Sequence, residues 1–275
     1  MRLPRASLVW LLLQAFPLVR VQAQSKPPAS DSGHVDKTFF TRRDAVLTGI
    51  AVGGTLAIAP FDERIARWAQ SPEVQGGPNR RTAIDWLTHI NETPLTLGAL
   101  ATYGIGRVGR MKTVTDIGLH VTESLVLTDV VSELIRGPIG RSRPRVTNDD
   151  AFRFHFGGGF THFDQRSFPS LHSSSAFAAA SSLVGEIRER HPSALWYAAP
   201  LLYGAALVPG FTRVYLNQHW ASDIASGAFI GTLLGSKVVR YAHSHEPSKV
   251  DRILLGTTIV PMGDGQFAVA VSLRR

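Results

Sequence analysis

The chain has 275 residues, of which 44% are hydrophobic and 18% are charged. This is enough for one or two hydrophobic cores and argues against wholesale disorder. The absence of cysteine excludes disulfides, thiolate metal sites and a lipidated N-terminal cysteine. The net charge of +8 suits anionic membranes, phosphorylated substrates or nucleic acid. Basic runs interleaved with aromatic residues, the mark of nucleic-acid binders, are missing, so no nucleic-acid partner is expected.

Residues 1–23 have the pattern of a secretory signal peptide. Arg2 and Arg5 give a basic start, Leu8 to Val19 an apolar core, and Val21-Gln22-Ala23 a cleavage site of small residues. An uncleaved anchor helix is the alternative, which Pro17 and the short apolar stretch disfavour. We therefore expect an exported protein of the cell envelope. It would lie in the periplasm, or in the inner membrane with its site facing the periplasm.

A helical domain is expected at residues 41–250, after a polar linker at residues 24–40. Thr41 and Asp44 have the spacing of a capping box, which predicts a helix start. The expected helices are Ala45–Pro60, Ile84–Asn91, Leu95–Arg107, Val114–Arg136, Ser173–Arg190, Ala194–Val208 and Ala221–Tyr241. The sixth of these is expected to stop at Pro209-Gly210, because proline interrupts the helical hydrogen bonds.

The C-terminal tail, residues 251–275, has a different pattern. Two stretches, Thr257–Met262 and Gln266–Leu273, flank Gly263-Asp264-Gly265, and apolar residues alternate along the second stretch. Alternation around a glycine-rich turn predicts a β-hairpin. The expected fold class is therefore mostly α: a helical bundle of about six helices with a short C-terminal β-hairpin packed on it.

The sequence leaves open whether the helices cross a membrane. Only Ser193 to Thr212 has a clear spanning length, taken as roughly 20 apolar residues. The expected helices at 114–136 and 221–241 carry several charged residues, which a spanning helix would have to turn toward a site or toward one another. A membrane-embedded bundle and a soluble helical bundle are equally supported.

Three short segments carry residues suited to chemistry. They are Arg136-Gly-Pro-Ile-Gly-Arg-Ser-Arg143-Pro144, then Pro169-Ser170-Leu171-His172, then Thr212-Arg213 followed after five residues by His219-Trp-Ala-Ser-Asp223. Taken singly, each has an ordinary explanation: a solvated basic loop, a helix cap, and a surface pair at i and i+4.

Taken together, the three segments supply every group that phosphate ester cleavage needs. Arginines neutralise phosphoryl oxygens in bidentate fashion, and Ser170 before a helix start offers a hydroxyl beside free backbone N–H groups. If a helix begins near residue 219, His219 and Asp223 share one face. Asp223 could then orient His219 for attack on phosphorus, as in a general base–orienter pair. His172 remains as the general acid.

The order and spacing of these segments resemble the type 2 phosphatidic acid phosphatase superfamily, over Arg136 to Asp223. Its pattern is Lys-x6-Arg-Pro, then Pro-Ser-Gly-His, then Ser-Arg-x5-His-x3-Asp. Three positions depart from it. Arg136 replaces Lys, which makes its role the least certain because reach and donor geometry change. Leu171 replaces Gly, and Thr212 replaces Ser. A side chain at 171 is tolerated if the residue lies in a first helical turn with negative φ.

The resemblance implies a role for each site residue. His219 would be the nucleophile that forms a phosphohistidine, His172 the general acid and Asp223 the group that orients His219. The expected phosphate-binding residues are Arg136, Arg143, Ser170, Leu171 through its backbone N–H, and Arg213. The implied protein is an exported phosphoric ester hydrolase without cofactor or metal, acting on phosphate monoesters or diphosphates, with lipids favoured as substrates.

Other functions remain compatible with the same residues. A soluble periplasmic nonspecific acid phosphatase is the first alternative. A vanadium-dependent haloperoxidase would use the same groups to hold vanadate, with His219 as its ligand. A non-catalytic envelope protein is disfavoured because the set of catalytic residues is intact.

Two further features were interpreted as structural. Phe152, Phe154 and Phe156 alternate in the stretch that joins the first two segments, and a short buried strand is favoured there over an apolar rim for a lipid tail. The histidines at positions 155, 162, 243 and 245 lack carboxylate partners at ligand spacing, so no metal site is expected.

Overall fold

A computed structural model describes residues 41–147, 150–245, 257–263 and 266–271. All of these lie within one compact unit, Lys37–Arg275. The predicted signal peptide at residues 1–23 and the predicted linker at residues 24–40 lie outside the described residues.

The described part contains ten α-helices and four short 3₁₀ helices. The α-helices are α1 (Arg42–Ile58), α2 (Asp62–Ala69), α3 (Pro72–Gln75), α4 (Pro78–Leu87), α5 (Glu92–Val108), α6 (Lys112–Ile139), α7 (Pro144–Thr147), α8 (Leu171–Arg190), α9 (Leu195–Tyr215) and α10 (Ala221–Ser244). The 3₁₀ helices are η1 (Ala59–Phe61), η2 (Gly158–Phe160), η3 (Phe163–Gln165) and η4 (Pro192–Ala194).

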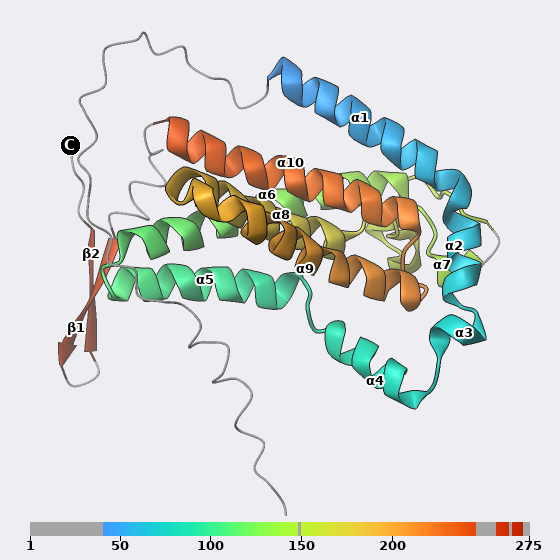
Figure 1. The fold of residues 1–275 in the computed structure, drawn as a ribbon, viewed down its shortest axis with the longest axis horizontal. Helices are drawn as coiled ribbons and strands as arrows, with labels where there is room; N and C mark the ends of the chain where they lie inside the picture. Colours follow the sequence, from blue (N-terminus) through green and yellow to red (C-terminus); the bar gives the residue numbers. More distant parts are fainter. Residues whose placement is uncertain (1–40, 148–149, 246–256, 264–265, 272–275) are drawn as a thin grey trace, which may run out of the picture. The chain divides into compact units, whose positions relative to one another are not determined.

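Helices α6, α8 and α10 pack against one another, with α5 against α6, α9 against α8 and α1 against α10 (Figure 1). Helices α8 and α10 approach each other closely, because glycines on α10 meet the backbone of α8. A Cβ on Gly231 would lie 2.1 Å from the carbonyl oxygen of Ser174, and one on Gly227 would lie 2.5 Å from that of Ser170. Any larger residue would push the two helices apart. This contact fixes the start of α8 beside the first turns of α10.

The start of α1 confirms the predicted capping box. Thr41 accepts from the backbone N–H of Asp44 through its side chain, and Asp44 accepts from the backbone N–H of Thr41. Asp44 also lies 2.5 Å from the Nζ of buried Lys237 on α10. Since a charge is retained in a protein interior when it is paired, this ion pair joins α1 to the bundle.

Helix α9 continues beyond the predicted stop at Pro209-Gly210, and that expectation was wrong. Pro200 and Pro209 both lie inside the helix, which ends at Tyr215. A proline removes one backbone hydrogen bond and bends a helix without having to end it, and packing against α8 offsets this cost. The Oγ1 of Thr212 donates to the carbonyl of Pro209 at 2.8 Å. As a result, Thr212 and Arg213 lie on the last turns of a helix.

The expected fold class needs correction in two respects, although mostly α is right. The described part has ten α-helices instead of about six, because prolines at 72 and 78 divide the region between α2 and α5 into short helices. The C-terminal β-hairpin is withdrawn from the fold class. Segments β1 (Thr257–Gly263) and β2 (Gln266–Val271) pair antiparallel, but residues 264–265, where the turn was predicted, lie outside the described residues. Two paired strands alone are marginally stable, and the described apolar clusters all draw on residues 66–220.

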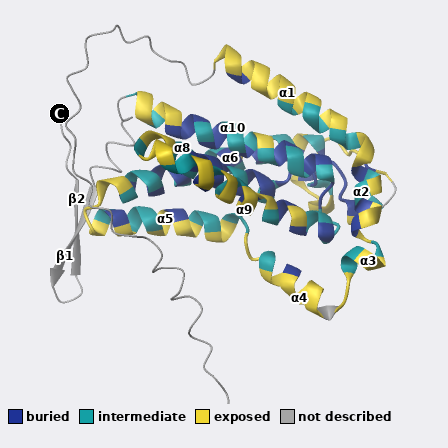
Figure 2. Cartoon of the chain, in the orientation of Figure 1, coloured by how far each residue is buried: buried dark blue, intermediate teal, exposed yellow. Residues whose placement is uncertain are grey.

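Large apolar side chains are exposed along several helices. Figure 2 shows long exposed stretches on α1 and α9, and Leu56 and Leu201 are 66% and 71% exposed. Two stretches of the described chain, Arg42–Ala69 and Pro192–Tyr215, are long and apolar enough to cross a membrane. An apolar surface of this extent is typical of a protein that contacts lipid or another protein.

Candidate active site

The structure brings the three predicted segments together. Arg136 lies in the last turn of α6 and is buried. Its Nη2 donates to the carbonyl of Pro169 at 3.2 Å, which ties the first segment to the second. The backbone N–H of Ser170 donates to the carbonyl of Asp223 at 3.1 Å, which ties the second to the third.

Ser170 and Leu171 lie at the start of α8, as predicted. Ser170 is the N-cap and Leu171 the first helical residue, so Leu171 takes the negative φ that tolerates a side chain. The Ser170 side chain is fully buried, yet it caps no backbone N–H. Its Oγ has no hydrogen-bond partner among the described residues. A buried hydroxyl beside a helix N-terminus is a natural donor to an anion.

His219 lies just before α10, not on it. The helix begins at Ala221 with Trp220 as its N-cap, two residues after His219, and the first turn of α10 still brings Asp223 next to His219. The Nδ1 of His219 lies 2.7 Å from the carbonyl oxygen of Ser167 and 3.7 Å from Oδ2 of Asp223. A carbonyl can only accept, so Nδ1 carries the proton. The Nε2 atom is therefore the one with a free lone pair, and it has no partner among the described residues.

Asp223 is held in a buried network that the sequence analysis missed. Its carboxylate accepts from the Ser167 hydroxyl at 2.5 Å and from the backbone N–H of Trp220 at 2.8 Å. It also pairs with Arg141 at 2.6 Å, and Arg141 pairs in turn with Asp62 at 2.7 Å. Asp223 thus fixes Ser167, the residue whose carbonyl holds His219.

His172 lies opposite His219. The two ring centroids are 6.4 Å apart and the planes are tilted by 58°. The Nε2 of His172 lies 3.5 Å from Oε2 of Glu92, the first residue of α5. Its Nδ1 has no hydrogen-bond partner among the described residues. Glu92 was not predicted, because it precedes the three segments and no spacing links it to them.

The three predicted phosphate-binding arginines differ in their partners. Arg143 donates to the side-chain oxygen of Gln218 at 3.0 Å and to the carbonyl of Phe163 at 3.2 Å. Arg136 pairs with Glu133 at 3.0 Å, and Arg213 donates to the carbonyl of Thr88. In Arg136 and Arg213 the Nε–H group is buried without a partner among the described residues. These two arginines keep donors free for an anion.

Burial and positive charge keep both histidines neutral. Burial lowers the pKa of His219 to about 4, and the positive charges of Arg143 and Arg136 act in the same direction, while Asp223 opposes them. Burial, together with the positive charge of Arg213, lowers the pKa of His172 to about 2. The site is therefore strongly electropositive, and a bound anion would compensate its positive charge.

The phenylalanine-rich stretch forms no buried strand, and that expectation was wrong. Phe156 is 85% exposed, and Phe152, Phe160 and Phe163 are also exposed. Arg141 and Phe154 form only an isolated bridge. The guanidinium carbon of Arg143 lies 4.3 Å from the centre of the Phe163 ring, a cation–π contact. The stretch is therefore an apolar edge next to one of the site arginines.

Comparison with known proteins places these residues in a family. The model of the PAP2 superfamily matches residues 117–246. The chain is 41% identical over 213 residues to lipid A 1-phosphatase of Porphyromonas gingivalis, covering 78% of this chain and 41% of that protein. It therefore spans less than half the length of this relative.

The fold also matches a solved structure. The crystal structure of a transmembrane PAP2-type phosphatidylglycerolphosphate phosphatase from Bacillus subtilis aligns with a TM-score of 0.58 at 21% identity. The alignment covers 75% of this chain and 98% of that one. This similarity concerns the fold, and two stretches of the described chain are also long and apolar enough to cross a membrane. Through residues 117–246, which contain all three segments from Arg136 to Asp223, the chain is a member of the PAP2 superfamily.

Proposed function

We propose that the chain is a lipid phosphatase that works through a phosphohistidine on His219. One observation carries the proposal: buried polar atoms on Ser170, Arg136, Arg213 and His219 lack hydrogen-bond partners among the described residues. Leaving buried polar groups unpaired costs free energy, so a cluster of them is typical of a site whose ligand completes the bonds. Guanidinium and hydroxyl donors select an oxyanion such as phosphate.

The first chemical step is attack by the free Nε2 of His219 on phosphorus. The N–P bond forms as the bond from phosphorus to the leaving oxygen breaks, and His172 gives that oxygen a proton. The proton on Nδ1 stays on the ring, hydrogen-bonded to the carbonyl of Ser167, and nearby Asp223 stabilises the positive charge on the ring. Water then attacks phosphorus and gives a proton to His172 as the N–P bond breaks, which frees His219 and releases inorganic phosphate.

A lipid is the proposed substrate, and two surfaces support this. The exposed phenylalanines near Arg143 offer an apolar edge to an acyl chain. A cavity of about 390 Å³ lies between α2, α9 and α10 and is lined by apolar side chains that include Trp68, Phe211 and Ile224. It borders the segment that carries Arg213 and His219. The lipid A and phosphatidylglycerolphosphate specificities named for the two relatives make phosphorylated lipids the first substrates to test.

The proposed location is the cell envelope, with the site facing the periplasm. Export by the predicted signal peptide would bring the site to that side. A soluble nonspecific acid phosphatase is the second candidate, since the same donors would bind any small phosphate ester. The exposed apolar helices favour the membrane enzyme.

A substrate panel tests the proposal. Purified full-length protein in detergent micelles would be assayed for phosphate release. The lipid arm contains phosphatidic acid, phosphatidylglycerol phosphate, undecaprenyl diphosphate and lipid A; the soluble arm contains p-nitrophenyl phosphate and glucose 6-phosphate. We expect kcat/KM to be at least tenfold higher for one lipid than for either soluble ester, and His219→Ala to abolish release. Higher kcat/KM for the soluble esters would point to the acid phosphatase. Vanadate-dependent bromide oxidation without phosphate release would point to the haloperoxidase.

A further inference from the structure

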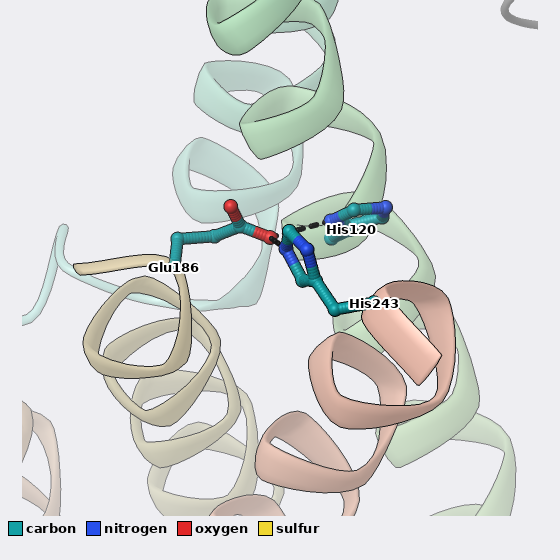
Figure 3. A group of neighbouring side chains, drawn as sticks. All are labelled: His120, Glu186 and His243. Atoms are coloured by element: carbon teal, nitrogen blue, oxygen red, sulfur yellow. Dashed lines mark hydrogen bonds and ion pairs between the residues drawn. The ribbon is translucent and has the colours of Figure 1, made fainter. Parts of the chain in front are cut away.

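A second group of chemically active side chains lies away from the phosphatase site. His120 on α6, Glu186 on α8 and His243 on α10 point toward one another from three different helices (Figure 3). Their candidate ligand atoms all lie within 4.8 Å of one another. The carboxylate that meets His243 comes from another helix, so no local spacing in the sequence marks the pair.

The cluster and the phosphatase site are separated along all three helices. His120 and Arg136 are sixteen positions apart on α6, which is about 24 Å at 1.5 Å per residue. Asp223 and His243 are twenty positions apart on α10, which is about 30 Å. The cluster therefore belongs to the other end of these helices, and its function does not depend on the proposed phosphatase.

The distances between the three side chains come close to those of a metal site. Oε1 of Glu186 lies 2.5 Å from Nδ1 of His120 and 3.0 Å from Nε2 of His243. Two ligands of a tetrahedral zinc ion, each about 2.0–2.1 Å from it, are roughly 3.3 Å apart. The two distances to Oε1 of Glu186 are therefore within 1 Å of the separation expected around a zinc ion. The His120 and His243 rings are 5.6 Å apart between centroids and nearly perpendicular, so they approach Glu186 from different sides.

The charges around the cluster favour a cation. Arg190 donates to Oε2 of Glu186 at 2.8 Å and leaves Oε1 to the histidines. Arg190 also lies 3.3 Å from Asp116. When both histidines are neutral, Arg190, Glu186 and Asp116 together carry one net negative charge. A neighbour that fixes a carboxylate in this way is the usual surrounding of a metal ligand.

We propose that His120, Glu186 and His243 bind one divalent transition-metal ion, best matched by Zn²⁺, and that this ion links α6, α8 and α10. Two imidazoles and a carboxylate are ligands that zinc accepts, with a fourth position left for water. His120 would bind through Nδ1 and His243 through Nε2, each keeping its proton on the other ring nitrogen. The role is structural, because the ion would cross-link helices at a distance from the reacting groups.

Zinc binding and thermal stability test the proposal on the full-length protein in detergent. The protein would be stripped with a chelator and dialysed against Zn²⁺, and bound zinc would be measured by mass spectrometry. We expect one ion per chain. At a hundredfold excess over Kd, the melting temperature should rise by roughly 5–10 °C.

The matched variants are His243→Ala and His245→Ala, since both residues lie at the end of α10 and neither side chain is buried. His243→Ala should weaken zinc binding at least tenfold and remove the stabilisation. His245→Ala should bind zinc as the unmodified protein does. Glu186→Gln gives a second variant that keeps the side-chain volume, and it should also weaken binding. Absence of saturable binding to the unmodified protein, or equal binding to His243→Ala, would overturn the proposal. Phosphatase activity is not a readout, so failure here leaves the proposed function untouched.

Discussion

The ring centroids of His172, at the start of α8, and His219, two residues before α10, lie 6.4 Å apart, with the ring planes tilted by 58°. This gap suits a phosphoryl group with an attacking nitrogen on one side and a proton donor on the other. The free Nε2 of His219 and the free Nδ1 of His172 belong to this facing pair. The two histidines are thus expected to have different functions, which mutagenesis can separate.

The first prediction separates nucleophile from acid. His219→Ala should leave no acid-quenched ³²P label on the protein with any substrate. His172→Ala should lower the rate about 10²–10⁴-fold for a substrate with an alkoxide leaving group. It should spare p-nitrophenyl phosphate in part, because p-nitrophenolate leaves without a proton. Label retained on His219→Ala would identify another nucleophile. Equal losses for both leaving groups in His172→Ala would assign His172 to binding.

The second prediction concerns the pH dependence of kcat. His219 acts as the neutral form and its pKa in the free site is lowered to about 4, so kcat/KM should fall only as the pH drops toward 4. His172 must be protonated to donate, and its pKa in the free site is lowered to about 2. A bound phosphate dianion would compensate the arginines and raise that pKa, which gives kcat an alkaline limb. His172→Ala should lose the alkaline limb and keep the acid limb. A flat profile between pH 4 and 9 would contradict both roles.

The third prediction concerns Asp223. An amide in Asp223→Asn would place N–H groups against donors from Ser167, Trp220 or Arg141 and would weaken the charge pairing of Arg141. Breaking a buried ion pair typically costs 3–5 kcal/mol, so the free energy of unfolding should fall by about this amount. We also expect kcat to fall by roughly 10²–10⁴-fold, as for other orienting carboxylates.

Ser167→Ala is the matched control for this variant. It removes the hydroxyl that binds Asp223 but keeps the carbonyl that holds His219. It should cost about 1–3 kcal/mol of stability and leave kcat within tenfold of the unmodified enzyme. A loss of kcat as large as that of Asp223→Asn would show that the hydroxyl, and not the charge, is what the reaction needs.

The residues of the candidate site could be predicted from the sequence because they occur in three short segments with fixed internal spacing. Arg136, Ser170, His172, Arg213 and His219 all lie in the candidate site. The helix expected at Ser173–Arg190 is also present, and it begins two residues earlier than expected, at Leu171 with Ser170 as its N-cap.

The partners of these residues could not be predicted, because tertiary packing brings them in from elsewhere in the chain. Asp62 and Glu92 lie far upstream, and neither position has a local pattern that marks it. Arg141 was visible only as part of a basic cluster, with no sign that it binds Asp223. The path of α9 through Pro209 was missed since local rules treat proline as a helix end, whereas packing against α8 outweighs the lost hydrogen bond.

The fourth prediction concerns metal removal. Arginine and serine donors supply the positive charge that a metal ion would otherwise provide at a phosphoryl group. EDTA treatment should therefore leave kcat and KM unchanged while it lowers the melting temperature through the cluster around Glu186. Complete loss of activity that one divalent ion restores would place a metal in the reaction itself.

The fifth prediction assigns Glu92 as a positioning residue for the proton on His172. Its Oε2 lies 3.5 Å from His172 Nε2, and a carboxylate at this distance stabilises the protonated ring and raises its pKa. Glu92→Gln keeps the shape of the side chain and removes the charge. The alkaline limb of the kcat profile should move down by about one pH unit. A shift of this size corresponds to about 1.4 kcal/mol of interaction between the Glu92 carboxylate and the protonated ring of His172.

Glu133→Gln is the matched control for this last variant, since Glu133 pairs with Arg136 and not with His172. Loss of the Glu133 charge leaves Arg136 with one partner fewer, so we expect a change in KM while the alkaline limb stays in place. A merely structural role for Glu92 would lower activity equally at every pH and leave the limb where it is. An unmoved limb in Glu92→Gln, measured with a lipid whose leaving group needs a proton, would rule out control of His172 by Glu92.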